Sequence, residues 1–253
     1  ENTDPEFFWL TSFIETELLR AVWYPTTVAT QSATAKSIIA RYLHATSDCA
    51  EQELPFKLHD FGARGVSSLE SAALGGMAHL VNFMGTDTVS ALLAARRYYD
   101  CEMAGFSIPA AEHSTITSWG REHEADAYRN MLRQFARPGS VVAVVSDSYD
   151  IFHACDAIWG QQLHDAVIAS GATVVIRPDS GDPAITVPQV VQILAQRFGY
   201  TTNSKGFKVL QYVRIIQGDS INLTSLRQIL HNLHEAGFRP RTWPLAWAAA
   251  CCS

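Results

Sequence analysis

The chain has 253 residues, of which 47% are hydrophobic and 17% charged, and its formal net charge is −6. This length and composition are those of an ordinary globular protein with one large domain or two small ones. The negative charge argues against non-specific binding to nucleic acid, and no apolar run in the sequence is long enough to span a membrane. The N-terminus lacks a basic region followed by an apolar one, so we expect no signal peptide.

The hydrophobic pattern predicts two N-terminal helices, at residues 7–21 and 35–43, followed by alternating strands and helices. Strands are expected at 56–60, 79–83, 141–145, 173–176 and 213–217. Helices are expected at 67–78, 86–99, 117–135, 151–169, 187–198 and 223–236, and a polar loop at 200–206. This succession predicts an α/β fold, with a parallel sheet and helical crossovers.

Polar residues follow most of the predicted strands. They are Asp60, Asp147, Arg177, Asp179 and Asp219, the last next to Gly218. In a closed βα barrel, all strand ends of this kind converge on one face. A doubly wound sheet brings them together only near its switch point, so the pattern favours a barrel.

The sequence contains five cysteines, which is an odd number, and their spacing is irregular. They are Cys49, Cys101, Cys155, Cys251 and Cys252, and no pair has the spacing of a zinc finger. We therefore expect incidental thiols in a reducing compartment and a cytoplasmic location.

Residues 106–116 read Phe-Ser-Ile-Pro-Ala-Ala-Glu-His-Ser-Thr-Ile. An apolar segment closes with Glu112 and His113, and a helical pattern follows. An imidazole at a strand end, facing a helix N-terminus, suits the handling of anions. A histidine in such a place can equally be a structural hydrogen-bonding residue.

Taken together and in this order, the motifs resemble the nicotinamide phosphoribosyltransferase family. The resemblance runs from about residue 2 to 238 and rests on segments 9–11, 23–25, 57–61, 64–68, 110–115, 146–150, 176–181 and 216–219. It implies an irregular βα barrel of the type II phosphoribosyltransferase kind, incomplete in this chain, with sites that lie across a homodimer interface. It also implies synthesis of nicotinamide mononucleotide from nicotinamide and phosphoribosyl pyrophosphate in NAD biosynthesis.

The resemblance assigns contacts with nicotinamide to Phe61 and Asp87. Phe61 matches one jaw of an aromatic clamp, although a phenylalanine after a strand is more often part of a core. Asp87 matches the aspartate that accepts a hydrogen bond from the amide and repels nicotinate. Its sequence, Gly-Thr-Asp-Thr, is also a good helix cap. Ser107 and Ile108 are further candidate substrate-binding residues.

Further positions match residues that bind phosphate and ribose. Arg64 and Arg177 can hold phosphate bidentately. Asp179 and Asp219 resemble acceptors for ribose hydroxyl groups, although Arg-Pro-Asp-Ser-Gly is also a strong turn sequence. Gly218 would let the backbone approach the nucleotide closely.

His113 resembles the family histidine that ATP phosphorylates. The chemistry needs a neutral imidazole oriented through its second nitrogen, and Asp147, Glu112 and Asp150 are the candidate partners. Mg²⁺ is implied because pyrophosphate and ATP oxygens need a hard cation, whereas no metal-ligand set is evident in the sequence.

The chain also departs from the family pattern. Ile108 and Ala143 stand where valine and serine are expected, and Ala63 where an aromatic residue is common. The N-terminal region that supplies the partner subunit's stacking aromatic has no counterpart in this sequence, nor does the glycine-rich phosphate loop. We therefore expect this chain alone to be inactive. A nicotinate phosphoribosyltransferase and a non-catalytic binding fragment are the alternatives.

Residues 239–253 form a second, non-homologous region beside the partial barrel domain at 1–238. The family carries a segment like Leu-Ala-Phe-Gly-Met-Gly-Gly-Gly-Leu-Leu-Gln here. Codons for that segment, read one base later, give Trp-Pro-Leu-Ala-Trp-Ala-Ala-Ala-Cys-Cys, which is the sequence from Trp243 to Cys252. We therefore expect a frameshifted tail, poorly packed and without site residues.

Overall fold

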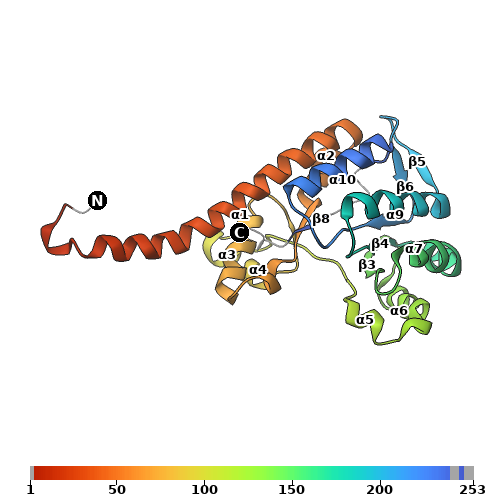
Figure 1. Cartoon of the computed structure of the whole chain (residues 1–253), viewed down its shortest axis with the longest axis horizontal. Helices are drawn as coiled ribbons and strands as arrows, with labels where there is room; N and C mark the ends of the chain where they lie inside the picture. The colour runs from red at the N-terminus through yellow and green to blue at the C-terminus, as the bar shows by residue number, and fades with distance from the viewer. Residues whose placement is uncertain (1–2, 240–244, 248–253) are drawn as a thin grey trace.

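The computed structural model describes residues 3–239 and 245–247 of the chain (Figure 1). Its N-terminal part is a short 3₁₀ helix, η1 (Pro5–Phe7), and the long helix α1 (Leu10–Thr46). The expectation of two separate helices is wrong, because α1 continues through Pro25. The second half of α1 packs against α3 (Leu69–His79) and α10 (Leu223–Glu235), and this tertiary packing outweighs the hydrogen bond that proline removes.

The segment after α1 places the first two parallel strands. It comprises α2 (Ala50–Glu53), η2 (Leu54–Phe56), β1 (Leu58–Asp60), η3 (Gly62–Gly65), α3, β2 (Gly85–Thr86) and α4 (Val89–Tyr99). The strand predicted at 79–83 is wrong. His79 ends α3, and the amide of Phe83 donates back to its carbonyl, so the apolar run closes a helix instead.

The middle of the chain contains the helix predicted at 117–135, which the structure divides. Its parts are α5 (His113–Thr117), η4 (Arg121–His123) and α6 (Glu124–Phe135). Gly120 lies between the first two with φ of 81°, a conformation that interrupts a right-handed helix and that glycine adopts readily.

The C-terminal half follows the predicted alternation closely. Its elements are β3 (Val141–Val145), α7 (Ile151–His153), the π-helix η5 (Ala154–Gln162), α8 (His164–Ser170), β4 (Thr173–Arg177), α9 (Pro183–Phe198), β5 (Tyr200–Thr202), β6 (Lys208–Leu210), β7 (Val213–Ile215), α10 and β8 (Leu245–Trp247). The loop expected at 200–206 is instead the start of an antiparallel β5–β6 hairpin.

Two three-stranded parallel sheets carry the site. Their strand orders are β2-β1-β8 and β3-β4-β7. The segment between α4 and α5 joins them, because Phe106 bridges to Gly85 and Ala110 bridges to Ala143. All these pairings are parallel, so the carboxyl ends of the strands lie along one edge. The predicted parallel α/β architecture is confirmed, whereas β7 and β8 are not paired in the described residues and barrel closure stays a prediction.

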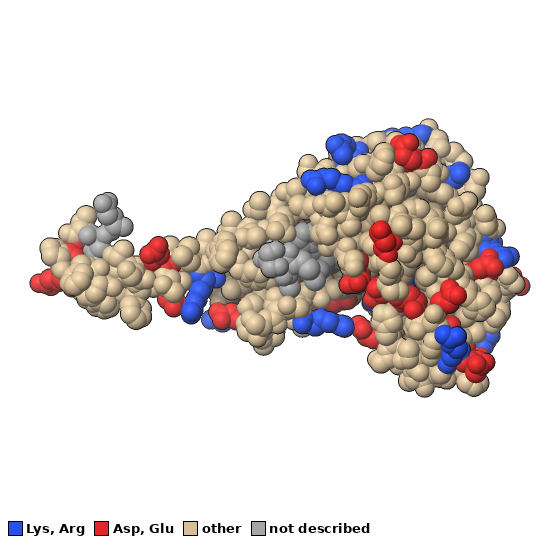
Figure 2. Space-filling model, viewed as in Figure 1, with Lys and Arg blue, Asp and Glu red and all other residues tan. Residues whose placement is uncertain are grey.

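The large core lies between these strands and the helices that cover them. Val144, Val174 and Val190 are fully buried in it, and the rings of Tyr128 and Trp159 stack with centroids 4.7 Å apart. Among the described helices, none is both long enough and apolar enough to cross a membrane. Acidic and basic side chains are interspersed over the face that Figure 2 shows.

Arg239 and β8 belong to the predicted tail. Arg239 is 3% exposed, and its guanidinium donates to Ser47 Oγ at 2.7 Å and to Glu53 Oε1 at 2.6 Å. The backbone of β8 pairs with β1 in parallel register. Poor packing is therefore wrong for Arg239 and stays a prediction for the rest of the tail, of which residues 240–244 and 248–253 lie outside the described residues.

Candidate functional site

Two adjoining cavities lie at the carboxyl edge of the parallel strands. We call them the inner cavity, of about 490 Å³, and the outer cavity, of about 570 Å³. Four residues line both: Phe61, Asp87, Ala110 and Arg177. A ligand bound at this junction would therefore reach both spaces at once.

The inner cavity is an apolar slot with a few polar groups. Its apolar walls are Phe61, Ile108, Ala143, Val175 and Ile216, which pack together. The Phe61 ring is only partly buried: it packs against this apolar cluster and also lines both cavities, so the structure is compatible with a role in packing and with a role in binding. The guanidinium carbon of Arg177 lies 5.5 Å from the centre of that ring, a cation–π distance. This shape suits a flat aromatic ring.

Asp87 is an acidic residue at the junction of the two cavities. Its Oδ1 accepts hydrogen bonds from His59 Nε2, at 2.9 Å, and from Ser107 Oγ. Burial acts to raise the pKa of Asp87, but these two hydrogen bonds and the nearby positive charge of Arg177 outweigh it and hold the pKa below its usual value. The helix-cap alternative is wrong, since Thr88 occupies the N-cap of α4 and no side chain caps that helix.

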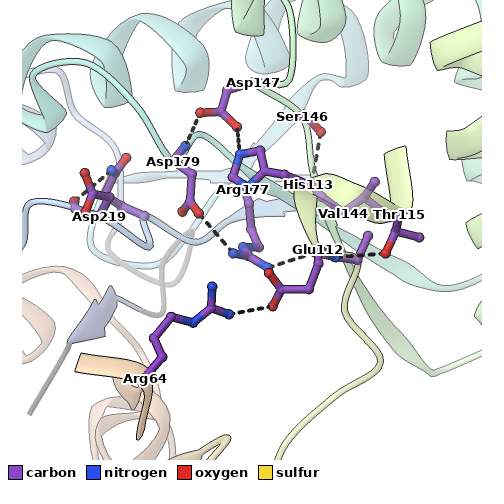
Figure 3. A network of polar contacts seen from close by, with 12 residues as sticks. Arg64, Glu112, His113, Thr115, Val144, Ser146, Asp147, Arg177, Asp179 and Asp219 are labelled. Carbon is purple, nitrogen blue, oxygen red and sulfur yellow. Dashed lines mark hydrogen bonds and ion pairs between the residues drawn. The ribbon is translucent and has the colours of Figure 1, made fainter. Parts of the chain in front are cut away.

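The outer cavity is polar and open. Arg64, His113, Asp179, Gly218 and Asp219 all line it. Figure 3 shows the Arg64 side chain reaching across to Glu112, to which it donates at 3.1 Å. Both members of this pair are exposed, and an exposed ion pair contributes little free energy. The Arg64 guanidinium can therefore leave the carboxylate and bind a phosphate at little cost in stability.

Arg177 and Asp179 form a nearly buried pair between the two cavities. Arg177 donates to the carbonyl of Ala111 at 3.0 Å and to Asp179 Oδ2 at 3.1 Å. Asp179 Oδ1 is buried with no hydrogen-bond partner among the described residues. Burial raises the pKa of Asp179, with repulsion from Asp147 acting in the same direction against the attraction of Arg177. The turn alternative is not observed, because the carboxylate binds Arg177 rather than its own backbone.

Gly218 lines the outer cavity, so the approach of its backbone to a nucleotide stays a prediction, and the structure adds a contact with Asp179. A Cβ atom at this position would lie 2.1 Å from Asp179 Oδ1. Real Cβ atoms do not come that close to any heavy atom, so glycine is the residue that leaves room for the Asp179 carboxylate.

His113 begins α5 and contacts one of its three candidate partners. Its Nε2 lies 2.9 Å from Asp147 Oδ1, and Asp147 Oδ2 accepts the backbone N–H of Asp179 at 3.1 Å (Figure 3). The other two candidates act elsewhere: Glu112 caps α5, and Asp150 caps α7. His113 Nδ1 has no hydrogen-bond partner among the described residues, and the side chain is 45% exposed.

The support beneath Asp147 was not predicted from the sequence. The hydroxyl of Ser146 donates to the carbonyl of Val144 at 3.0 Å and accepts the indole N–H of Trp159 at 3.0 Å. Trp159 lies in the π-helix, a geometry that often accompanies functional sites. His59 was missed as well; the signal was its place on a strand, one residue before Asp60 and out of phase with the buried positions.

Comparison with known proteins gives a consistent result. Residues 56–242 match the nicotinate phosphoribosyltransferase (NAPRTase) family. The chain is 65% identical over 238 residues to a nicotinamide phosphoribosyltransferase of Xanthomonas campestris pv. campestris, a match that covers 94% of this chain and 51% of that protein.

More distant relatives carry the same name. Nicotinamide phosphoribosyltransferases of Acinetobacter baylyi and Mycoplasma pneumoniae are 35% and 36% identical, over 94% and 92% of this chain and 50% and 52% of their own lengths. The chain thus spans about half the length of the curated relatives it matches.

Proposed function

Because the chain belongs to the nicotinate phosphoribosyltransferase family, we propose that it carries the base and phosphoribose sites of a nicotinamide phosphoribosyltransferase. The reaction transfers phosphoribose from phosphoribosyl pyrophosphate to nicotinamide, releases pyrophosphate and supplies NAD biosynthesis. The observation that carries the proposal is the junction of the two cavities at Phe61 and Arg177, with an ionised aspartate on the inner side.

In this proposal the inner cavity holds the base. Phe61 stacks on the pyridine ring, and Asp87 accepts a hydrogen bond from the amide. A second aromatic residue, from the partner subunit of a homodimer, would cover the other face of the ring. Ala143 lines the same cavity and offers no hydroxyl to the amide.

The outer cavity would hold the phosphoribose. Arg64 and Arg177 stabilise phosphate charge, while Asp179 and Asp219 accept ribose hydroxyl groups. Mg²⁺ fits this side of the site, because the buried Asp179 Oδ1 and the exposed Asp219 carboxylate are hard oxygen donors. When bound, the ion would supply positive charge to the pyrophosphate oxygens.

ATP would act as a co-substrate through His113. The γ-phosphoryl group moves to His113 Nδ1 as the bond to ADP breaks, while Nε2–H stays directed at Asp147. This assignment of the nitrogens rests on the 2.9 Å contact between Nε2 and Asp147. We also propose a reducing, cytoplasmic setting, since the described cysteines Cys49, Cys101 and Cys155 are unpaired.

Two measurements test the proposal. Equilibrium dialysis with radiolabelled bases measures the affinity of the chain for nicotinamide and nicotinate, and we expect nicotinamide to bind more tightly. Synthesis of nicotinamide mononucleotide is measured, with and without ATP, in an enzyme of the relatives' length that contains these residues; we expect the 253-residue chain alone to be inactive. Absence of nicotinamide binding and of synthesis would refute the proposal, and a preference for nicotinate would favour the sister activity.

A further inference from the structure

His59 is a polar residue of the inner cavity that contacts Asp87, and none of the roles assigned above belongs to it. It lies on β1 between Leu58 and Asp60, both of which are buried on the opposite face of the strand. The imidazole therefore points into the inner cavity, where 12% of the side chain is exposed.

The His59 ring is held on two sides. A Cβ atom on Gly85, its partner on β2, would lie 2.7 Å from His59 Nδ1, so the ring packs directly on the glycine backbone. On the other side the Phe61 ring lies 4.8 Å away, centre to centre. With both sides occupied, Nε2 is held in the direction of Asp87.

Both hydrogen bonds that Asp87 accepts are made by the same carboxylate oxygen. His59 Nε2 and Ser107 Oγ both donate to Oδ1, and no described residue donates to Oδ2. A carboxylate without these bonds could rotate and present either oxygen. The two donors therefore fix one oxygen and leave the other as an acceptor without a donor among the described residues, in a cavity whose further polar lining includes Thr173 and Arg177.

We propose that His59 is a specificity-positioning residue that acts through Asp87 to select an amide over a carboxylate. This inference rests on the proposed function. A carboxamide N–H donates to the free Oδ2, whereas a carboxylate has no proton to donate and is repelled by Asp87. Asp87 also occupies the N–H of His59 and the hydroxyl of Ser107, which would otherwise be suitable donors for the acid.

The proposed role of His59 reverses when Asp87 is removed. Without the Asp87 carboxylate, His59 and Ser107 become free donors at the end of the slot, and nicotinate gains two partners there. His59 thus favours the amide when Asp87 is present and favours the acid when Asp87 is absent. If His59 had a purely structural role, its substitution would weaken the binding of both bases, with and without Asp87.

The test is equilibrium dialysis of labelled nicotinamide and nicotinate with the full chain. The proteins are the unmodified chain, His59→Leu, His59→Gln, Asp87→Ala and the double variant His59→Leu/Asp87→Ala. We expect His59→Leu to weaken nicotinamide binding at least about tenfold. His59→Gln, whose amide can donate in place of Nε2, should stay within about threefold of the unmodified chain.

Asp87→Ala should bind nicotinate more tightly than the unmodified chain, and adding His59→Leu should remove that gain. Equal losses for both bases in His59→Leu, or an effect of His59→Leu that is the same with and without Asp87, would overturn the inference and leave the proposed function standing. Failure of the unmodified chain to bind nicotinamide would instead overturn both.

Discussion

The substitution Gly218→Ala tests the arrangement between the two cavities. The added Cβ would lie 2.1 Å from Asp179 Oδ1, whereas ordinary contacts begin near 3.4 Å, so the carboxylate must move by roughly 1 Å. Asp179 is held by Arg177 Nη2 at 3.1 Å. A shift of that size lengthens this contact to about 4 Å, beyond hydrogen-bonding distance.

The expected loss comes from the bond that is broken. A hydrogen bond between charged groups contributes about 1.5–3 kcal/mol, which corresponds to roughly 10–100-fold in affinity. We therefore expect phosphoribosyl pyrophosphate to bind about 10–100-fold more weakly to Gly218→Ala, because Arg177 and Asp179 both face its site. Nicotinamide affinity should change little, since Gly218 does not line the inner cavity. Equilibrium dialysis with each labelled ligand measures both effects.

A double-mutant cycle separates a role through Asp179 from a direct approach of the Gly218 backbone to the nucleotide. In an Asp179→Ala background there is no carboxylate for the new Cβ to displace, so Gly218→Ala should cause no further loss. A loss of the same size in that background would refute the argument from Asp179. It would show instead that the backbone at Gly218 approaches the bound nucleotide directly.

Three further predictions concern single side chains. In an enzyme of the relatives' length, Asp87→Ser should narrow the preference for nicotinamide over nicotinate at least about tenfold in kcat/KM, with exposed Asp165→Ser as the control; an unchanged ratio would contradict the role of Asp87. His113→Ala should abolish ATPase activity and phosphohistidine but retain ATP-independent synthesis. The control, His231→Ala at an exposed position, should keep both ATPase activity and phosphohistidine. Normal ATP coupling in His113→Ala would exclude this assignment. The Cys155 thiol should resist iodoacetamide at pH 8 until the chain is unfolded, because burial raises its pKa and leaves almost no thiolate; alkylation in the folded chain, detected by peptide mass mapping, would argue against the described core.

The fold was predictable wherever the sequence signal is local. Residues 141–145 form an unbroken apolar run between a glycine turn and Ser146, and β3 has these bounds. The sequence pattern gave the wrong secondary structure where tertiary packing determines it. Pro25 suggests a break, yet α1 passes through it because its second half is buried against other helices. The run at 79–83 has strand composition, but its buried Phe83 stacks on His79 to close α3.

The site was predictable in its residues and not in its contacts. Strand ends identify Asp147 and Asp179, because parallel strands bring such ends to one edge. Sequence could not choose among Asp147, Glu112 and Asp150 as the partner of His113, since the choice depends on caps that the two rejected acids make. His59 was missed because its role needs Gly85, which is distant in sequence and opposite in register.

Two observations about the C-terminal region point in different directions. Arg239 is part of the packed body, through its hydrogen bonds to Ser47 and Glu53, and the family match extends to residue 242. The composition after that point matches nothing expected of a phosphate loop, with Trp243, Trp247 and the Cys251–Cys252 pair. A change of reading frame at about residue 242 would account for both, because it preserves the buried Arg239 and the family match and alters only the residues C-terminal to them.

The coding DNA tests this directly. Tryptophan has a single codon, so the positions of Trp243 and Trp247 fix six bases of the coding strand. Reading the same strand one base earlier, from the base before the Trp243 codon, should give Leu-Ala-Phe-Gly-Met-Gly-Gly-Gly-Leu-Leu-Gln, or a close variant. The glycine N–H groups of such a segment could cradle a phosphate. If no frame of that DNA encodes a glycine-rich segment, the frameshift hypothesis is wrong and the pairing of β8 with β1 becomes a native feature of this chain.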